Sequence, residues 1–201
     1  MTNRRDNKRQ FYEYDPDANS YAGIGFAVGA VGDDNDDSAR VMNLHRDDTP
    51  IEFTWMPLAS HGLEGNPSKI SDFPSVSNWR IVPMMSERAW DALKPIIGNV
   101  CEALAVRHPF EGRYFLIHVL RTIDALNEDA SEFERRSAND SRIRQVIRYA
   151  FHEAMIQGIH IFKLPNKQGG GLIVDDVFRK AVEDNGLRGL RFRELPLAQG
   201  Y

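Results

Sequence analysis

Residues 175–195 constrain the fold more than any other stretch, because they hold the start of a helix, its end and a strand. Asp175 or Asp176 can cap the helix by accepting hydrogen bonds from the free amides of its first turn. Gly186 is placed to end the helix in the left-handed conformation, which glycine adopts without a steric penalty. After it, Leu190 and Phe192 alternate with arginines, as in a strand with one buried face.

Residues 80–120 repeat this order and add a hairpin. Ser86 is a good N-cap, and Gly98-Asn99 ends the predicted helix. Two apolar stretches, 100–106 and 114–120, are predicted to be paired strands. From these two units we predict four core residues, which are Trp90, Phe178, Leu190 and Phe192. Units of strand, helix and strand predict an α+β fold with a largely antiparallel sheet, a few short helices and long N-terminal loops.

The N-terminal third is less regular. Residues 11–14 can begin a strand, whereas the glycine content of 21–31 weakens any regular assignment. Residues 51–55 alternate Ile, Phe and Trp on one face, which predicts a half-buried strand. Residues 57–79 are rich in proline and glycine and are predicted to form a long irregular connection, a kind of segment that often carries function.

The stretch 141–158 fits two patterns. Its apolar residues match the helical spacing, which favours a helix, but Ile147, Tyr149 and Phe151 also alternate as a strand would. The segments 159–164 and 171–174 read as strands on either side of a glycine-rich loop.

Length and charge limit the class of protein. A chain of 201 residues suits one domain, and its net charge of -4 argues against a general nucleic-acid binder. No apolar run approaches the roughly 20 residues of a membrane span. Residues 1–10 are basic but precede FYEYDPD, not an apolar signal sequence, so we interpret them as a flexible tail. Cys101 is the only cysteine, which suits a reducing cytoplasm.

Two motifs resemble metal sites but lack required ligands. Residues 152–156, HEAMI, begin like the zinc helix H-E-x-x-H, but Ile156 stands where the second histidine is needed. The acidic run DDNDD at 33–37 resembles a calcium loop, but Ser38 and Leu44 replace its glycine and its glutamate. We therefore predict no metal and no cofactor.

Candidate catalytic groups are also incomplete. The glycines at 169–171 lack the Gly-Lys-Ser/Thr of a phosphate-binding loop. Cys101 lies in an apolar strand, where a buried thiol is expected more often than a thiol–imidazole pair with His108 or His118. The sequence therefore predicts a protein that is not an enzyme.

Several segments in chain order resemble one family: SDFPS (71–75), VPMMSERAWDAL (82–93), YFLIHVLRTIDALN (114–127), HIFKL (160–164) and GLRGLRFREL (186–195). This ordered set, over residues 71–195, resembles the bacterial polymorphic-toxin immunity protein family eleven, of the Myxococcus type. The resemblance implies a single domain over 11–201, with a strand rather than a helix near 143–151.

The resemblance also implies a function. Immunity proteins of this kind bind and neutralise a cognate toxin or secretion-system effector in the cytoplasm of the producing cell, during interbacterial competition. The expected partner is a protein, with a nuclease toxin as one class, and neither a membrane nor a direct nucleic-acid partner is expected.

Charge and aromatic content suggest contact residues for such a toxin. A nuclease carries positive charge to hold phosphates, so an inhibitor gains from acidic groups that steer association. Aromatic side chains near the 57–79 connection would supply the contact core. The candidate toxin-binding residues are Asp33, Asp34, Asp36, Asp37, Trp55, Phe73 and Trp79.

Two other functions stay open from the sequence. One is a small enzyme with a dispersed active site near 57–79, which titratable groups gathered in a deep pocket would support. The other is a nucleic-acid-associated regulator that uses the basic tail and the Arg135–Arg148 segment, which a contiguous positive face would support.

Overall fold

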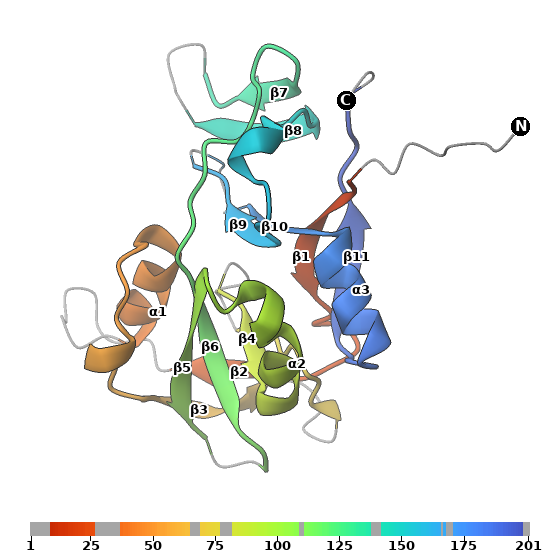
Figure 1. Ribbon diagram of the computed structural model, residues 1–201. Coiled ribbons are helices and arrows are strands. Elements are labelled where there is room, and N and C mark those ends of the chain that lie inside the picture. Colours follow the sequence, from red (N-terminus) through yellow and green to blue (C-terminus); the bar gives the residue numbers. More distant parts are fainter. Residues whose placement is uncertain are drawn as a thin grey trace, which may run out of the picture.

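The computed structural model describes residues 9–26, 37–64, 69–76, 82–108, 111–137, 142–165, 167 and 171–198, with the side chains of 37–39 and 61–64 left out. Three α-helices and eleven strands lie in this part of the chain, mostly in antiparallel sheets, which confirms the predicted α+β class (Figure 1). The tail up to residue 8, the acidic residues 33, 34 and 36, and Trp79 lie outside the described residues.

The first sheet has four strands in the order β11 (Leu190–Glu194), β1 (Phe11–Pro16), β10 (Leu172–Asp175) and β9 (Ile161–Lys163). All three pairings are antiparallel. The N-terminal strand therefore lies between two strands from the last thirty residues of the chain, so the sheet needs both ends of the sequence.

The second sheet has five strands in the order β2 (Gly23–Phe26), β3 (Leu58–Glu64), β5 (Cys101–Arg107), β6 (Tyr114–Val119) and β4 (Met84–Ser86). Only the β3–β5 pairing among these is parallel. Strands β7 (Glu132–Arg135) and β8 (Ile143–Arg148) form a separate hairpin, drawn at the top of Figure 1.

Helices α2 (Glu87–Ile97) and α3 (Asp176–Asp184) begin at the predicted caps. The Ser86 side chain accepts a hydrogen bond from the amide of Ala89, and the Asp175 side chain accepts one from the amide of Phe178. Gly186 has the expected positive φ, 59°. The two cap–helix–glycine units of the sequence are thus real, and their helices pack against each other.

The main core lies between the two larger sheets. Tyr12 of β1, Leu93 of α2, Ile117 of β6 and Phe178 of α3 all belong to it, so one apolar cluster joins both sheets through α2 and α3. Alternation along each strand sends the next side chain to the opposite face. For example, Phe11 packs in a second cluster beneath the β7–β8 hairpin.

A third apolar cluster covers the other face of the five-stranded sheet. Helix α1 (Asp37–Arg46) contributes Val41 and Leu44, which pack against Leu104 and Leu116 of the central strands. The sequence did not predict a helix over residues 38–46, so α1 was not expected. Its position on this face places the chain that follows it beside β5 and β6.

Three expected segments differ from the structure. Residues 51–55 are not a strand: Glu52–Thr54 form a 3-10 helix, η1, and Phe53 is exposed. The 57–79 connection contains β3 and so is not wholly irregular. Residues 143–148 form β8, so the helix favoured by spacing was wrong and the strand implied by the family resemblance is confirmed.

The four predicted core residues are buried to different degrees. Phe178 is 0% exposed, whereas Trp90, Leu190 and Phe192 are partly buried and pack against the same cluster. Strand β11 lies at the edge of its sheet, which explains why Leu190 and Phe192 keep some contact with solvent.

A buried carboxylate connects the N-terminal half to both helical units. Asp72 accepts hydrogen bonds from the Ser86 hydroxyl at 2.8 Å, from the Arg88 guanidinium at 2.5 Å and from the amide of Arg188 at 2.9 Å. Arg88 also donates to the carbonyls of Asn185 and Gly186. Asp72 therefore holds the start of α2 against the turn that follows α3.

Candidate functional site

The structure places the described contact candidates in different environments. Phe73 is 1% exposed in the main core, so as placed its ring offers no surface to a partner. Trp55 is half-buried, donates a hydrogen bond from Nε1 to the carbonyl of Ala105, and lies under the Arg40 guanidinium. Asp37 is the first residue of α1. Of Phe73 and Trp55, only Trp55 lies beside a surface suited to binding.

That surface is the segment between α1 and β3, residues 47–57, which we call the 47–57 loop. Phe53 on its 3-10 turn is 101% exposed and Met56 is 71% exposed, the two highest values among the exposed large hydrophobic side chains of the described residues. Single exposed apolar side chains are common, whereas apolar side chains grouped on one surface often mark a binding site. The loop presents two strongly exposed apolar side chains three residues apart in sequence.

The base of the loop is fixed by a buried carboxylate. Glu102 of β5 accepts hydrogen bonds from the backbone amides of Ile51 at 2.9 Å and Glu52 at 3.1 Å. The side chain of Glu102 is 9% exposed, so these bonds are largely shielded from water. They satisfy two amides at the start of η1, where the negative charge is also favoured by the orientation of the peptide dipoles.

His118 of β6 completes this clamp. Glu102 and His118 are directly opposite each other in the β5–β6 register, so both point toward α1. His118 Nδ1 lies 3.1 Å from a Glu102 carboxylate oxygen, and Nε2 lies 2.7 Å from the carbonyl oxygen of Asp47. Nε2 donates to that carbonyl, which can only accept, and Nδ1 faces the carboxylate, so both ring nitrogens have a partner.

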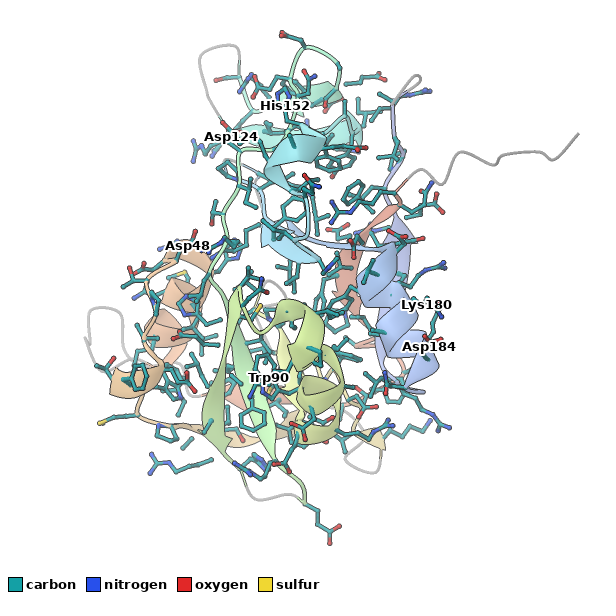
Figure 2. The ribbon with its side chains drawn as sticks, in the orientation of Figure 1. Asp48, Trp90, Asp124, His152, Lys180 and Asp184 are labelled. Carbon is teal, nitrogen blue, oxygen red and sulfur yellow. The ribbon has the colours of Figure 1, made fainter. Side chains whose placement is uncertain are left out.

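A second clamp holds the start of the loop, where it leaves α1. The Nζ of Lys163, a buried residue of β9, lies 2.6 Å from the Asp48 carboxylate and donates to the carbonyl of His45. Thr122 donates to the same carboxylate from its amide and its hydroxyl. Figure 2 shows Asp48 at the upper end of α1, where this junction lies.

These contacts shift two pKa values in the expected directions. Burial raises the pKa of Asp48, but the hydrogen bonds from Lys163 and Thr122 and the Lys163 charge outweigh it, and the pKa is lowered. Burial, with the positive charges of Lys163 and Arg46, lowers the pKa of His45 to about 4. Asp48 is therefore ionised and His45 neutral at neutral pH.

A pocket of about 210 Å³ opens beside the loop. Its walls include Arg40 and Asn43 of α1, Asp47 and Trp55 of the loop, and His118 of the sheet. The pocket combines an indole wall with a carboxylate and a guanidinium, so it can take a polar side chain with an apolar stem.

Other titratable clusters among the described residues serve the fold. Asp175, 1% exposed, caps α3 and accepts hydrogen bonds from Arg9, while His160 Nδ1 lies 2.8 Å away. Burial raises the pKa of the Cys101 thiol, which keeps it protonated, and its strand register places it opposite Val119. Cys101 and His118 therefore point to opposite faces of the sheet and do not pair.

Metal and membrane sites were also sought in the described residues. There, no three His, Cys, Asp or Glu side chains are grouped as a metal ion would need. In the same part of the chain, no helix is long and apolar enough to cross a membrane.

Sequence reasoning missed Phe53, Met56 and the Glu102–His118 clamp. The alternating pattern of 51–55 suggested that Phe53 faces inward. A usable signal did exist for the clamp: the strands 100–106 and 114–120 contain Glu102 and His118, each a strongly polar residue in a mostly apolar run. Pairing of the two strands brings these residues to the same face, where only a mutual interaction makes their burial tolerable.

Comparison with known proteins agrees with the resemblance found in the sequence. Residues 101–196 match the Immunity protein family (Imm11), which confirms the resemblance to immunity family eleven. No curated protein matches the chain. The matched residues run from the start of β5 to just beyond β11, and they include Glu102, His118 and Lys163.

Proposed function

We propose that this chain, whose residues 101–196 match the Immunity protein family (Imm11), binds a cognate bacterial toxin and neutralises it in the cytoplasm of the producing cell. The family match is the observation that carries the proposal. Its toxin is, in this proposal, an effector used in interbacterial competition, with a nuclease as the favoured class. Inhibition would occur by direct protein–protein contact and without turnover.

The placement of polar groups supports a binding role. Most buried polar side chains discussed above, including Asp72, Glu102, Lys163 and Asp175, make hydrogen bonds or ion pairs within the fold. A catalytic group has to present its reactive atom to a substrate, whereas these atoms are engaged in holding loops and helix ends. Such a pattern is expected of a rigid scaffold that presents a surface.

An enzyme with an active site near 57–79 is less well supported. Within the described part of that segment, Ser71 and Asp72 are buried, and Asp72 is bonded to the start of α2. In the pocket beside the 47–57 loop, His118 is already bonded on both ring nitrogens. Catalytic turnover by this chain would refute the proposal.

A nucleic-acid role for the Arg135–Arg148 segment is also less well supported. Three of its arginines face carboxylates: Arg135 lies 2.5 Å from Glu128, Arg144 lies 3.7 Å from Glu134 and Arg148 lies 3.4 Å from Glu132. These exposed pairs contribute little to stability, but they cancel the charge that would attract phosphates. The β7–β8 hairpin is therefore a mixed-charge surface.

Co-expression tests the proposed function. The C-terminal domain encoded by the neighbouring reading frame is expressed in a bacterial host with and without this chain. We expect growth arrest by that domain alone, normal growth with the chain, and a complex that elutes as one species. Growth arrest that the chain does not relieve, with no complex formed, would refute the proposal.

A further inference from the structure

We propose that the 47–57 loop is the toxin-binding surface, with Phe53 as its central anchor and Met56 as a second contact. The toxin surface that binds this loop is basic and has an apolar pocket that receives Phe53. This inference rests on the proposed function and goes further, because it names the contact and the chemistry of the partner. Phe53 and Met56 were not among the candidate residues expected from the sequence.

Two apolar side chains of the 47–57 loop are strongly exposed to solvent. Phe53 and Met56 are three residues apart and are the two most exposed large hydrophobic side chains among the described residues. Aromatic and methionine side chains are enriched in the buried centres of protein interfaces, where a few anchors carry most of the affinity. An exposed phenylalanine at the tip of a turn has the geometry of an anchor that enters a pocket of its partner.

Hydrogen bonds hold the 47–57 loop in place on the sheet. Glu102 and His118 hold the backbone at Asp47, Ile51 and Glu52, and Trp55 is hydrogen-bonded to β5. The loop is therefore fixed on both sides of Phe53 by hydrogen bonds to β5. A side chain presented from a fixed backbone loses less conformational freedom on binding, which favours affinity.

The sequence before and within the 47–57 loop is acidic. Between residues 33 and 52 the sequence holds seven carboxylates and two arginines, a local charge of -5, compared with -4 for the whole chain. The acidity of the protein is thus concentrated immediately before and within the loop that carries Phe53. Asp48 is paired with Lys163, and the carboxylates that remain favour a positive partner surface, as a toxin that holds phosphates would have.

The pocket beside the loop adds a receiving site. It is about 210 Å³ and has Asp47 and Trp55 in its walls. A lysine or arginine of the toxin could place its stem against the indole and its charge near the Asp47 carboxylate. In this arrangement Phe53 enters the toxin while a toxin side chain enters this chain.

The test compares methionines at two surfaces. Met56 lies in the loop, whereas Met155 lies on the 3-10 turn Glu153–Met155, η3, next to His152 in the upper part of Figure 2. Both are exposed, 71% and 48%. Phe53→Ala, Met56→Ala and Met155→Ala are purified in the full chain, and the dissociation constant for the neighbouring frame's C-terminal domain is measured by calorimetry. Melting temperatures check that each variant is folded.

We expect Phe53→Ala to weaken binding by roughly 30-fold or more, as for a hot-spot residue. Met56→Ala should weaken binding by a smaller factor, and Met155→Ala should leave the dissociation constant unchanged. Wild-type binding with an unchanged constant in Phe53→Ala and Met56→Ala would overturn the assignment of the surface and leave the proposed function standing. Absence of wild-type binding would overturn both.

Discussion

Lys163 and Asp48 show how single residues determine the position of the proposed binding loop. A buried lysine is costly unless it is paired, and Lys163 is paired with Asp48 and the carbonyl of His45. Because β9 lies in one sheet and α1 covers the other, this one side chain joins two parts of the molecule. The position of the loop therefore depends on a few charged contacts as well as on apolar packing.

His45 makes the stability depend on pH in a defined window. Its pKa is lowered from the ordinary 6.5 to about 4 in the folded protein. The unfolded chain therefore binds the proton more readily than the folded protein does. The stability that neutral His45 contributes is fully present above pH 6.5 and is lost as the pH falls toward 4. The lowered pKa of Asp48 acts at a more acidic pH and does not obscure this window.

Denaturant unfolding of His45→Gln and of the wild type at several pH values from 7 to 4 measures this effect. We expect a smaller loss of stability with acid in His45→Gln. His152→Gln is the matched control, since His152 is exposed, and it should follow the wild type. Equal pH dependence in all three proteins would contradict the neutral, buried state of His45.

At the scale of elements, the helix caps and the hairpin were predictable because their signals are local. Ser86, Asp175 and Gly186 act within one turn of their own helix, so the sequence alone indicates where α2 and α3 begin and where α3 ends. The strands 100–106 and 114–120 are adjacent in sequence and pair with each other. Local chemistry decided these elements.

The elements that could not be predicted depend on distant contacts. Residues 51–55 alternate like a strand, but Glu102, fifty residues away, binds the amides of Ile51 and Glu52 and holds a 3-10 turn instead. Residues 143–148 have helical spacing but pair with β7. The candidate surface escaped prediction for the same reason, since the exposure of Phe53 follows from that distant carboxylate.

Two glycines after α3 give a prediction at this scale. Gly186 and Gly189 both have positive φ, 59° and 100°. A Cβ at Gly186 meets nothing within 4 Å, whereas a Cβ at Gly189 would lie 2.2 Å from the Ser71 hydroxyl oxygen and 2.3 Å from its Cβ. Segment 71–73 packs so closely against the backbone at residue 189 that only glycine fits there.

Gly186→Ala should cost about 1–2 kcal/mol of unfolding free energy, from the left-handed backbone alone. Gly189→Ala should cost roughly 1–3 kcal/mol more, because the clash with Ser71 adds to the same strain. Chemical denaturation of the two variants measures both values. Equal costs would show that segment 71–73 does not pack against the turn as closely as described.

At the scale of the whole molecule, we propose that residues 11–201 form one domain. Strand β1 pairs with both β10 and β11, and the main core takes side chains from both larger sheets. The residues that match the immunity family, 101–196, include β10 and β11 but not β1. The matched region therefore depends on the N-terminal strand for its central pairing.

Thermal unfolding of the full chain should show one cooperative transition, with the same midpoint by circular dichroism and tryptophan fluorescence. A fragment of residues 101–196 should show no such transition, because β10 and β11 lose the strand between them. A fragment that melts sharply near the midpoint of the full chain would divide the protein into two domains.

The acidic segment gives a prediction about association rates. Replacing Asp33, Asp34, Asp36 and Asp37 with asparagine removes four of the seven carboxylates between residues 33 and 52. We expect slower association with the toxin at low salt and little change at high salt, because steering is screened by ions. An association rate unchanged at low salt would remove these four residues from the mechanism.

Neutralisation by binding requires a fixed ratio of this chain to the toxin, which a titration measures. The activity of a toxin domain that the chain neutralises in co-expression is measured while the purified chain is added in fixed steps and incubated for increasing times. The account predicts that activity falls linearly and reaches zero at one chain per toxin, with no further loss over time. Complete inactivation by a small fraction of an equivalent, increasing with time, would contradict it and show turnover.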